Sequence, residues 1–179
     1  MVMKKALFGL LGVVMGAAAA DARPIVVYYS MSGNTAAAAE IIRDATGADV
    51  FEITTADPNH YPSEYRPATE VAKSEIQNDT IVEINAAPDL TEYDVVFVGT
   101  PTWWGTMAVP MKSFLRENDL AGKTVAVFNT HEGSGRGTVH TDIESMTPDA
   151  THVDGIAIRG SAVADSDDEI KAWVGEVVK

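Results

Sequence analysis

The chain contains no cysteine among its 179 residues. Disulfide bonds, thiolate metal ligands and cysteine nucleophiles are therefore all excluded. Histidine is also scarce, and the four residues of this type, His60, His131, His140 and His152, lack the spacing of a metal site. We expect these histidines to be scattered surface residues.

Positive charge is in short supply as well. The chain has 13 basic and 26 acidic residues, which gives a net charge of −13 at pH 7. So acidic a protein repels nucleic acids and anionic membrane surfaces, so neither is expected as a partner. The charge suits basic protein partners, or simply solubility.

The N-terminus has the pattern of a secretory signal peptide. Lys4 and Lys5 precede an uncharged apolar run over residues 6–20, and the small-x-small sequence Ala20-Asp21-Ala22 follows. The run is shorter than a spanning helix normally requires, which favours cleavage over a retained membrane anchor. We therefore predict a signal peptide at 1–22 and one domain at 23–179.

Cleavage after Ala22 would leave 11 basic and 25 acidic residues and a net charge of −14. The mature protein is then expected in the periplasm or outside the cell and not embedded in a membrane. No pair of arginines precedes the apolar run, which points to export of the unfolded chain. Any cofactor would be acquired after export.

Beyond the signal, short β-rich apolar runs alternate with helix-like segments. Continuous hydrophobicity within each run is typical of strands that are covered on both faces of a parallel sheet. The predicted strands are 25–29, 50–53, 95–98, 125–128 and 153–158, and the predicted helices are 35–46, 68–77, 109–118, 137–146 and 166–178. The expected fold is α/β, with three layers and a doubly wound sheet of five parallel strands.

The turn after the first strand is rich in hydroxyl groups and opens directly onto a helix. Its sequence is Ser30-Met31-Ser32-Gly33-Asn34-Thr35. Unpaired N–H groups and the helix dipole favour an anion at such a place, and phosphate is the natural occupant. The turn holds no lysine or arginine, so hydroxyl and amide groups alone would bind it.

Two further loops follow the third and fourth predicted strands. One carries adjacent aromatic residues, Trp103 and Trp104, and the other is glycine-rich over residues 129–137. In doubly wound sheets ligands bind beyond the carboxyl ends of the strands, where the strand order reverses. The three loops together indicate a site for a flat aromatic molecule that bears a phosphate.

Other phosphate and acyl-transfer sites do not match. The sequence Gly122-Lys123-Thr124 ends like a P-loop, but position 117 is glutamate and a strand follows instead of a helix. No Gly-x-Gly-x-x-Gly follows the first strand, and no Gly-x-Ser-x-Gly elbow is present. A phosphate-accepting signalling domain would need an aspartate where Gly99 and Thr100 stand.

With these three loops in this order, the chain from about Pro24 to its C-terminus resembles the flavodoxin-like family, in particular short-chain members with a Pro-x-Trp-Trp-Gly loop. The resemblance implies strand order 2-1-3-4-5 and bound FMN. The residues that it implies for FMN are Ser30, Met31, Ser32, Gly33, Asn34 and Thr35 at the phosphate, Thr100, Pro101, Thr102, Trp103, Trp104 and Gly105 on one side of the isoalloxazine, and Thr130, His131, Glu132, Gly133, Ser134 and Gly135 on the other.

The resemblance implies electron transfer between redox partner proteins. No proton donor or nicotinamide clamp stands out near the three loops, which favours a carrier without a substrate pocket of its own. The alternative is an NAD(P)H-dependent flavin reductase that acts on a quinone or a similar small acceptor. A third possibility is a binding module that has kept the fold and lost the flavin.

Overall fold

The computed structural model describes residues 22–179. The predicted signal peptide lies outside the described residues except for Ala22, so it stays a prediction. In the part of the chain that is described, no helix has both the length and the apolar character needed to cross a membrane.

Five parallel strands form the sheet, as predicted. They are β1 (Pro24–Tyr28), β2 (Asp49–Glu52), β3 (Val95–Trp103), β5 (Thr124–His131) and β6 (Thr151–Arg159), and a two-residue strand, β4 (Thr106–Met107), pairs antiparallel with β3. The order β2-β1-β3-β5-β6 is the predicted order 2-1-3-4-5 once the short β4 is set aside.

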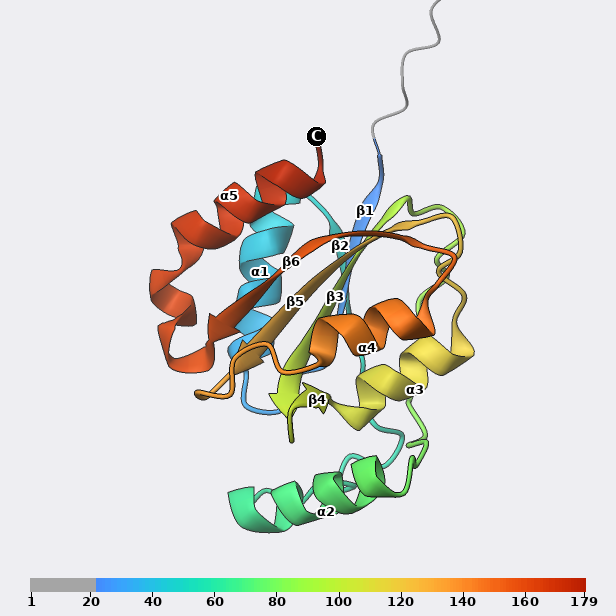
Figure 1. The fold of residues 1–179 in the computed structure, drawn as a ribbon, viewed down its shortest axis with the longest axis vertical. Coiled ribbons are helices and arrows are strands. Elements are labelled where there is room, and N and C mark those ends of the chain that lie inside the picture. The colour runs from blue at the N-terminus through green and yellow to red at the C-terminus, as the bar shows by residue number, and fades with distance from the viewer. Residues whose placement is uncertain (1–21) are drawn as a thin grey trace, which may run out of the picture.

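Helices cover both faces of this sheet. One face carries α1 (Asn34–Thr46) and α5 (Asp167–Val177), and the other carries α3 (Val109–Glu117) and α4 (Val139–Met146) (Figure 1). A 3-10 helix, η1 (Gly160–Asp165), joins β6 to α5. The remaining helix, α2 (Tyr65–Gln77), lies beyond the carboxyl ends of the strands, near β4 (Figure 1).

Two of the strands continue well past their predicted carboxyl ends. The sequence suggested strands at 95–98 and 125–128, but β3 continues to Trp103 and β5 to His131. Pairing continues because Thr100 is opposite Asn129 and Pro101 is opposite Thr130. Polar residues and a proline at these positions concealed the strand ends, since sequence patterns detect only the apolar middle of a strand.

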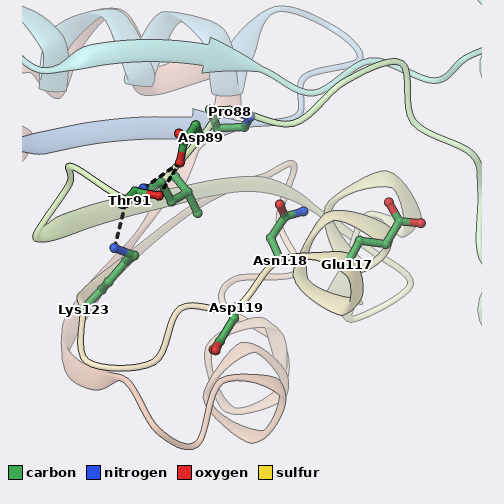
Figure 2. Close-up of a pocket in the computed structure, with 8 residues that line it drawn as sticks. Pro88, Asp89, Thr91, Glu117, Asn118, Asp119 and Lys123 are labelled. Carbon is green, nitrogen blue, oxygen red and sulfur yellow. Dashed lines mark hydrogen bonds between the residues drawn. The ribbon is translucent and has the colours of Figure 1, made fainter.

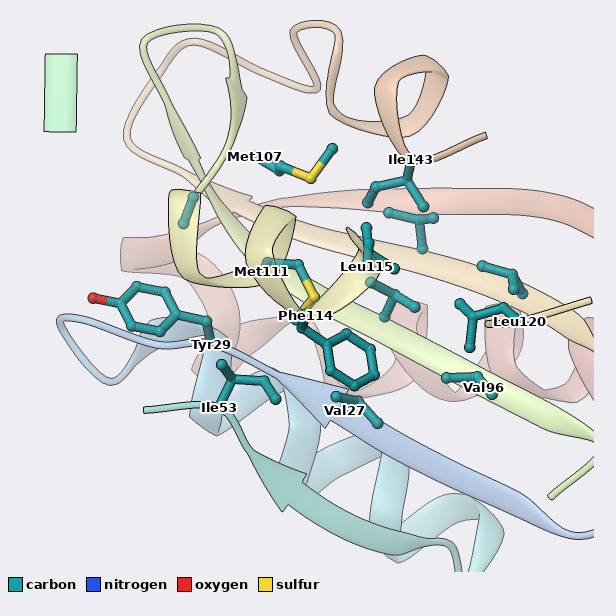
Figure 3. Packing of buried hydrophobic residues seen from close by; sticks show 14 of the residues in the cluster. Val27, Tyr29, Ile53, Val96, Met107, Met111, Phe114, Leu115, Leu120 and Ile143 are labelled. Carbon is teal, nitrogen blue, oxygen red and sulfur yellow. The ribbon is translucent and has the colours of Figure 1, made fainter. Parts of the chain in front are cut away.

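Strand residues alternate between two hydrophobic cores. In β1, Ile25 and Val27 face the α3 and α4 side, whereas Val26 faces α1 and α5. Figure 3 shows the first core, where the ring of Phe114 from α3 lies against Val27. Because both faces are buried in the middle of the sheet, the central parts of β1, β3 and β5 read as continuous apolar runs.

Gly99 in β3 is a point of close approach within the second core. It is paired with Phe128 of β5, and a Cβ on Gly99 would lie only 2.1 Å from Cζ of that ring. The ring occupies the space that any side chain at this position would need.

A series of side-chain hydrogen bonds connects the second and third loops to α4. The Asn129 amide donates to the Thr102 hydroxyl (2.8 Å) and the Thr102 hydroxyl donates to the Gly135 carbonyl (3.1 Å). The Asn129 side-chain oxygen therefore accepts from Nε2 of His140 at 2.8 Å, which places a proton on that nitrogen. Asn129 is fully buried and His140 is 4% exposed, so the expectation of a surface histidine is wrong at position 140.

Burial and the neighbouring Arg136 guanidinium lower the pKa of His140 from 6.5 to about 4. The folded protein thus holds a neutral imidazole where the unfolded chain takes up a proton below about pH 6.5.

We predict that Gly99→Ala lowers the free energy of unfolding by about 1–3 kcal/mol, because the added methyl group overpacks the core against Phe128. Urea denaturation followed by circular dichroism measures the change. The control is Gly175→Ala in α5, where an added Cβ meets nothing within 4 Å and helix propensity favours alanine. Equal effects at the two positions would contradict the packing argument.

We also predict a pH-dependent loss of stability from His140. As pH falls from about 6.5 to about 4, the unfolded state binds a proton that the folded state refuses, so the free energy of unfolding falls; below about pH 4 this contribution stops changing. Denaturation curves recorded at several pH values give the free energy of unfolding, and this free energy should change less with pH for His140→Gln than for the unmodified protein. Parallel pH profiles for the two proteins would show that His140 does not titrate differently on folding.

Candidate functional site

A cavity of about 530 Å³ lies at the carboxyl edge of the sheet, a volume typical of small-molecule sites. It is bounded by the ends of β3 and β5, by the turn before α1 and by α2. Its lining residues are Met31, Ser32, Asn34, Tyr65, Ala68, Thr69, Glu70, Ala72, Pro101, Thr102, Trp103, Trp104, Gly105, Thr130, His131, Glu132 and Ser134.

The cavity brings the three predicted loops together. Twelve of the eighteen residues predicted to contact a cofactor line it, with members from each loop. The other six, Ser30, Gly33, Thr35, Thr100, Gly133 and Gly135, do not form its wall. Thr100 is fully buried, and its hydroxyl accepts from the N–H of Ala108 and donates to the Pro101 carbonyl. Thr100 therefore stabilises the β3–β4 hairpin and does not contact the cavity.

The start of α1 has the free donors that an anion needs. Gly33 is the N-cap residue, with φ +88°, and has no side chain with which to cap the helix. The N–H of Ala36 donates to the Ser30 hydroxyl and that of Ala37 to the Gly33 carbonyl. Within residues 22–179, the N–H groups at positions 32–35 make no intramolecular hydrogen bond. They remain available to a ligand.

Two side-chain hydrogen bonds join this turn to the third loop. The buried hydroxyls of Thr35 and Thr130 are 2.8 Å apart, and the Asn34 amide donates to Glu132 at 3.0 Å. A pair of hydroxyls has two protons and uses one between them, so one is left for another acceptor. Gly160 backs the second contact, since a Cβ there would clash with both Asn34 and Glu132.

The second loop is a tight hairpin between β3 and β4. Trp104 and Gly105 form its two-residue turn, both with positive φ (+49° and +88°). This is the geometry of a type I′ turn, which usually holds asparagine and glycine. A tryptophan with positive φ is strained, and such strain is characteristic of functional sites.

The two tryptophans have different surroundings. Trp103 packs edge-on against Tyr29 and Tyr61, with ring centroids 5.5 and 5.0 Å apart. Trp104 is 54% exposed, and its indole N–H donates to the Thr69 carbonyl of α2 at 3.0 Å. The Lys73 ammonium lies 4.7 Å from the centre of the Trp104 ring. Trp103 is thus fixed by an aromatic cluster and Trp104 by α2.

The contribution of α2 to the site was not predicted from the sequence. Residues 65, 68, 69, 70 and 72 line the cavity, although no cofactor contact was predicted there. The signal in the sequence was weak: two alanines, Ala68 and Ala72, lie one helical turn apart. Both are buried in the structure. Small side chains on that face let the helix come close to the cavity.

A buried carboxylate anchors α2. Glu75 is 8% exposed, and it accepts from the Tyr61 hydroxyl at 2.7 Å and pairs with His60 at 2.5 Å. Burial, together with Glu75, raises the pKa of both Tyr29 and Tyr61, so both are neutral phenols. The segment before α2 is thereby held against the aromatic cluster that supports Trp103.

A second hollow, of about 410 Å³, lies at the opposite edge of the sheet (Figure 2). It is open and polar, and its one cation, Lys123, donates to the main-chain carbonyls of Leu90 and Tyr93. The Asp89 carboxylate accepts from Thr91 (Figure 2). This lysine and this carboxylate are therefore engaged within the chain.

Known proteins are similar to this chain in sequence and in fold. A quinone-type NAD(P)H dehydrogenase from Archaeoglobus fulgidus is 28% identical over 142 residues, 73% of either chain. The crystal structure of a candidate flavoprotein from Bacteroides eggerthii superposes with a TM-score of 0.72 at 27% identity, over 88% of this chain and 98% of that one. A flavoprotein from Lactobacillus acidophilus, crystallised with FMN, has the same fold, with a TM-score of 0.66 at 23% identity over 80% and 97% of the two chains.

The family model for flavodoxin matches residues 23–177. This range contains every strand and helix of the described residues and all three loops around the cavity. The protein therefore belongs to the flavodoxin family.

Proposed function

We propose that this flavodoxin-family protein binds FMN non-covalently and carries electrons between redox partners outside the cytoplasm. One observation carries the proposal: a single cavity joins the start of α1, where the N–H groups of residues 32–35 are unbonded, to a wall that contains two tryptophans. Phosphate and a planar ring are the two chemical parts of FMN. When bound, FMN supplies a ring that accepts and releases electrons.

The phosphate end fits the donors of the first loop. The unbonded N–H groups at positions 32–35, the Ser32 hydroxyl and the spare proton of the Thr35–Thr130 pair are all neutral donors. They can hold a phosphate without a lysine or arginine in the turn. A phosphate held in this way is bound and is not activated for transfer.

The ring end fits the hairpin and α2. Trp103 and Trp104 offer aromatic surface, and the small side chains of Ala68 and Ala72 line the same cavity. Met31, Tyr65 and Trp104 stand exposed at the rim, at 41%, 80% and 54%. A ring seated there would keep an edge near the surface, where electrons pass to a partner.

A second function has a specific observation in its favour. The Archaeoglobus fulgidus relative bears the name NAD(P)H dehydrogenase (quinone), so reduction of a quinone by NAD(P)H is the alternative. The carrier role is preferred because nothing in the cavity wall resembles a clamp for the nicotinamide nucleotide. The lining has no arginine, and its charged side chains are the carboxylates of Glu70 and Glu132.

The net charge suggests the nature of the partner. A protein with 25 acidic and 11 basic residues after cleavage at Ala22 attracts a basic protein surface. The proposed location, periplasmic or extracellular, rests on the N-terminal sequence pattern alone.

We predict that the double variant Ser32→Ala/Thr35→Ala binds FMN more weakly by about 1–3 kcal/mol, the scale for donors lost from a buried anion. Quenching of flavin fluorescence measures the affinity. Riboflavin, which has no phosphate, is the matched control, and its affinity should change much less. An equal loss for both flavins would remove the phosphate from this turn.

We expect the protein loaded with FMN to turn over NAD(P)H and a quinone negligibly unless a separate reductase is added. The measurement is NAD(P)H oxidation at 340 nm with and without such a reductase. Rapid steady-state turnover by the protein alone would replace the carrier with the quinone reductase. A protein that stays colourless after incubation with FMN would reject both functions.

A further inference from the structure

His131 occupies a special place in the cavity wall. It is the last residue of β5, and its half-buried side chain lines the cavity beside Thr130 and Glu132. Neither the phosphate turn nor the tryptophan hairpin contains it. It is also the one ring-bearing side chain that the third loop contributes to the cavity.

A hydrogen bond from the main chain selects the tautomer of this histidine. The N–H of Gly133 donates to Nδ1 of His131 at 3.0 Å. A ring nitrogen that accepts carries no proton, so the proton of the neutral ring is on Nε2. Gly133 has φ +128°, which residues with side chains rarely adopt, so the backward turn of the main chain depends on glycine.

Two polar side chains of the cavity wall, those of Asn34 and Thr102, are engaged within the chain. Asn34 donates to Glu132 and Thr102 donates to the Gly135 carbonyl. Across residues 22–179, Nε2 of His131 forms no hydrogen bond. A donor of fixed tautomer on a cavity wall, without a partner in the chain, is prepared for a ligand.

We propose that His131 donates its Nε2–H to an acceptor atom on the polar edge of the flavin ring. The inference rests on the FMN binding proposed above, and it goes further because it assigns the residue that tunes the cofactor. Reduction increases the electron density on the ring heteroatoms, and hydrogen bonds to charged acceptors are about twice as strong as neutral ones. His131 would therefore favour the reduced ring, whereas the adjacent Glu132 carboxylate opposes it.

The first test uses the protein without flavin. Nitrogen-15 NMR of the histidine rings in alkaline buffer should show His131 with its proton on Nε2 and an unprotonated Nδ1 that accepts a hydrogen bond. The Nε2–H signal should move when FMN is added. A proton on Nδ1 would overturn the inference whether or not FMN binds, which separates its failure from that of the proposed function.

The second test compares two variants with FMN bound. His131→Leu removes the donor, and His131→Gln, the matched control, keeps an N–H at a similar reach. For His131→Leu, the ratio of the dissociation constants of reduced and oxidised FMN should rise by about tenfold or more, seen as a more negative midpoint potential. His131→Gln should stay close to the unmodified protein. An unchanged potential in His131→Leu, with FMN still bound, would overturn the assignment.

Discussion

The unbonded N–H groups at the start of α1 are the constraint on which the rest of the site depends. A helix must find partners for its first N–H groups, and here Gly33 leaves those of residues 32–35 without one. The first two side chains of the helix bond to the third loop, Thr35 to Thr130 and Asn34 to Glu132. These bonds fix the third loop beside the open anion site.

The tryptophan wall depends on the displacement of α2. This helix leaves the face of the sheet and lies across its carboxyl edge (Figure 1), held by the hydrogen bonds of Glu75 with Tyr61 and of Trp104 with Thr69. Trp104 combines a strained, positive φ with the second contact, the hydrogen bond from its indole N–H to the Thr69 carbonyl. Strain in the hairpin and the anchoring of α2 are thus parts of one arrangement, as expected where a site costs local stability.

The sequence predicted the fold well because continuous apolar runs, separated by helices, admit few arrangements. The five parallel strands, their order and the meeting of three loops at one edge were all predicted, and family resemblance supplied the order itself. The predictions failed where polar residues take tertiary roles. β3 reaches Trp103 through Thr100 and Pro101, and the buried His140 donates a hydrogen bond from Nε2 to the side-chain oxygen of Asn129. Nothing in the local pattern of hydrophobicity reports such pairings.

By itself the sequence determined the chemistry of the site: hydroxyl and amide donors without a cation, two adjacent aromatic rings, and a histidine in a glycine-rich loop. These are properties of residue types and of their order along the chain. Only the tertiary structure decided which donors remain free and that α2 belongs to the site. It also decided that Trp103 is held by an aromatic cluster and Trp104 by α2. It also decided the tautomer of His131, since a main-chain N–H two residues away selects it. Those outcomes depend on distances between segments far apart in the chain or on a backbone angle, which a pattern of residues does not contain.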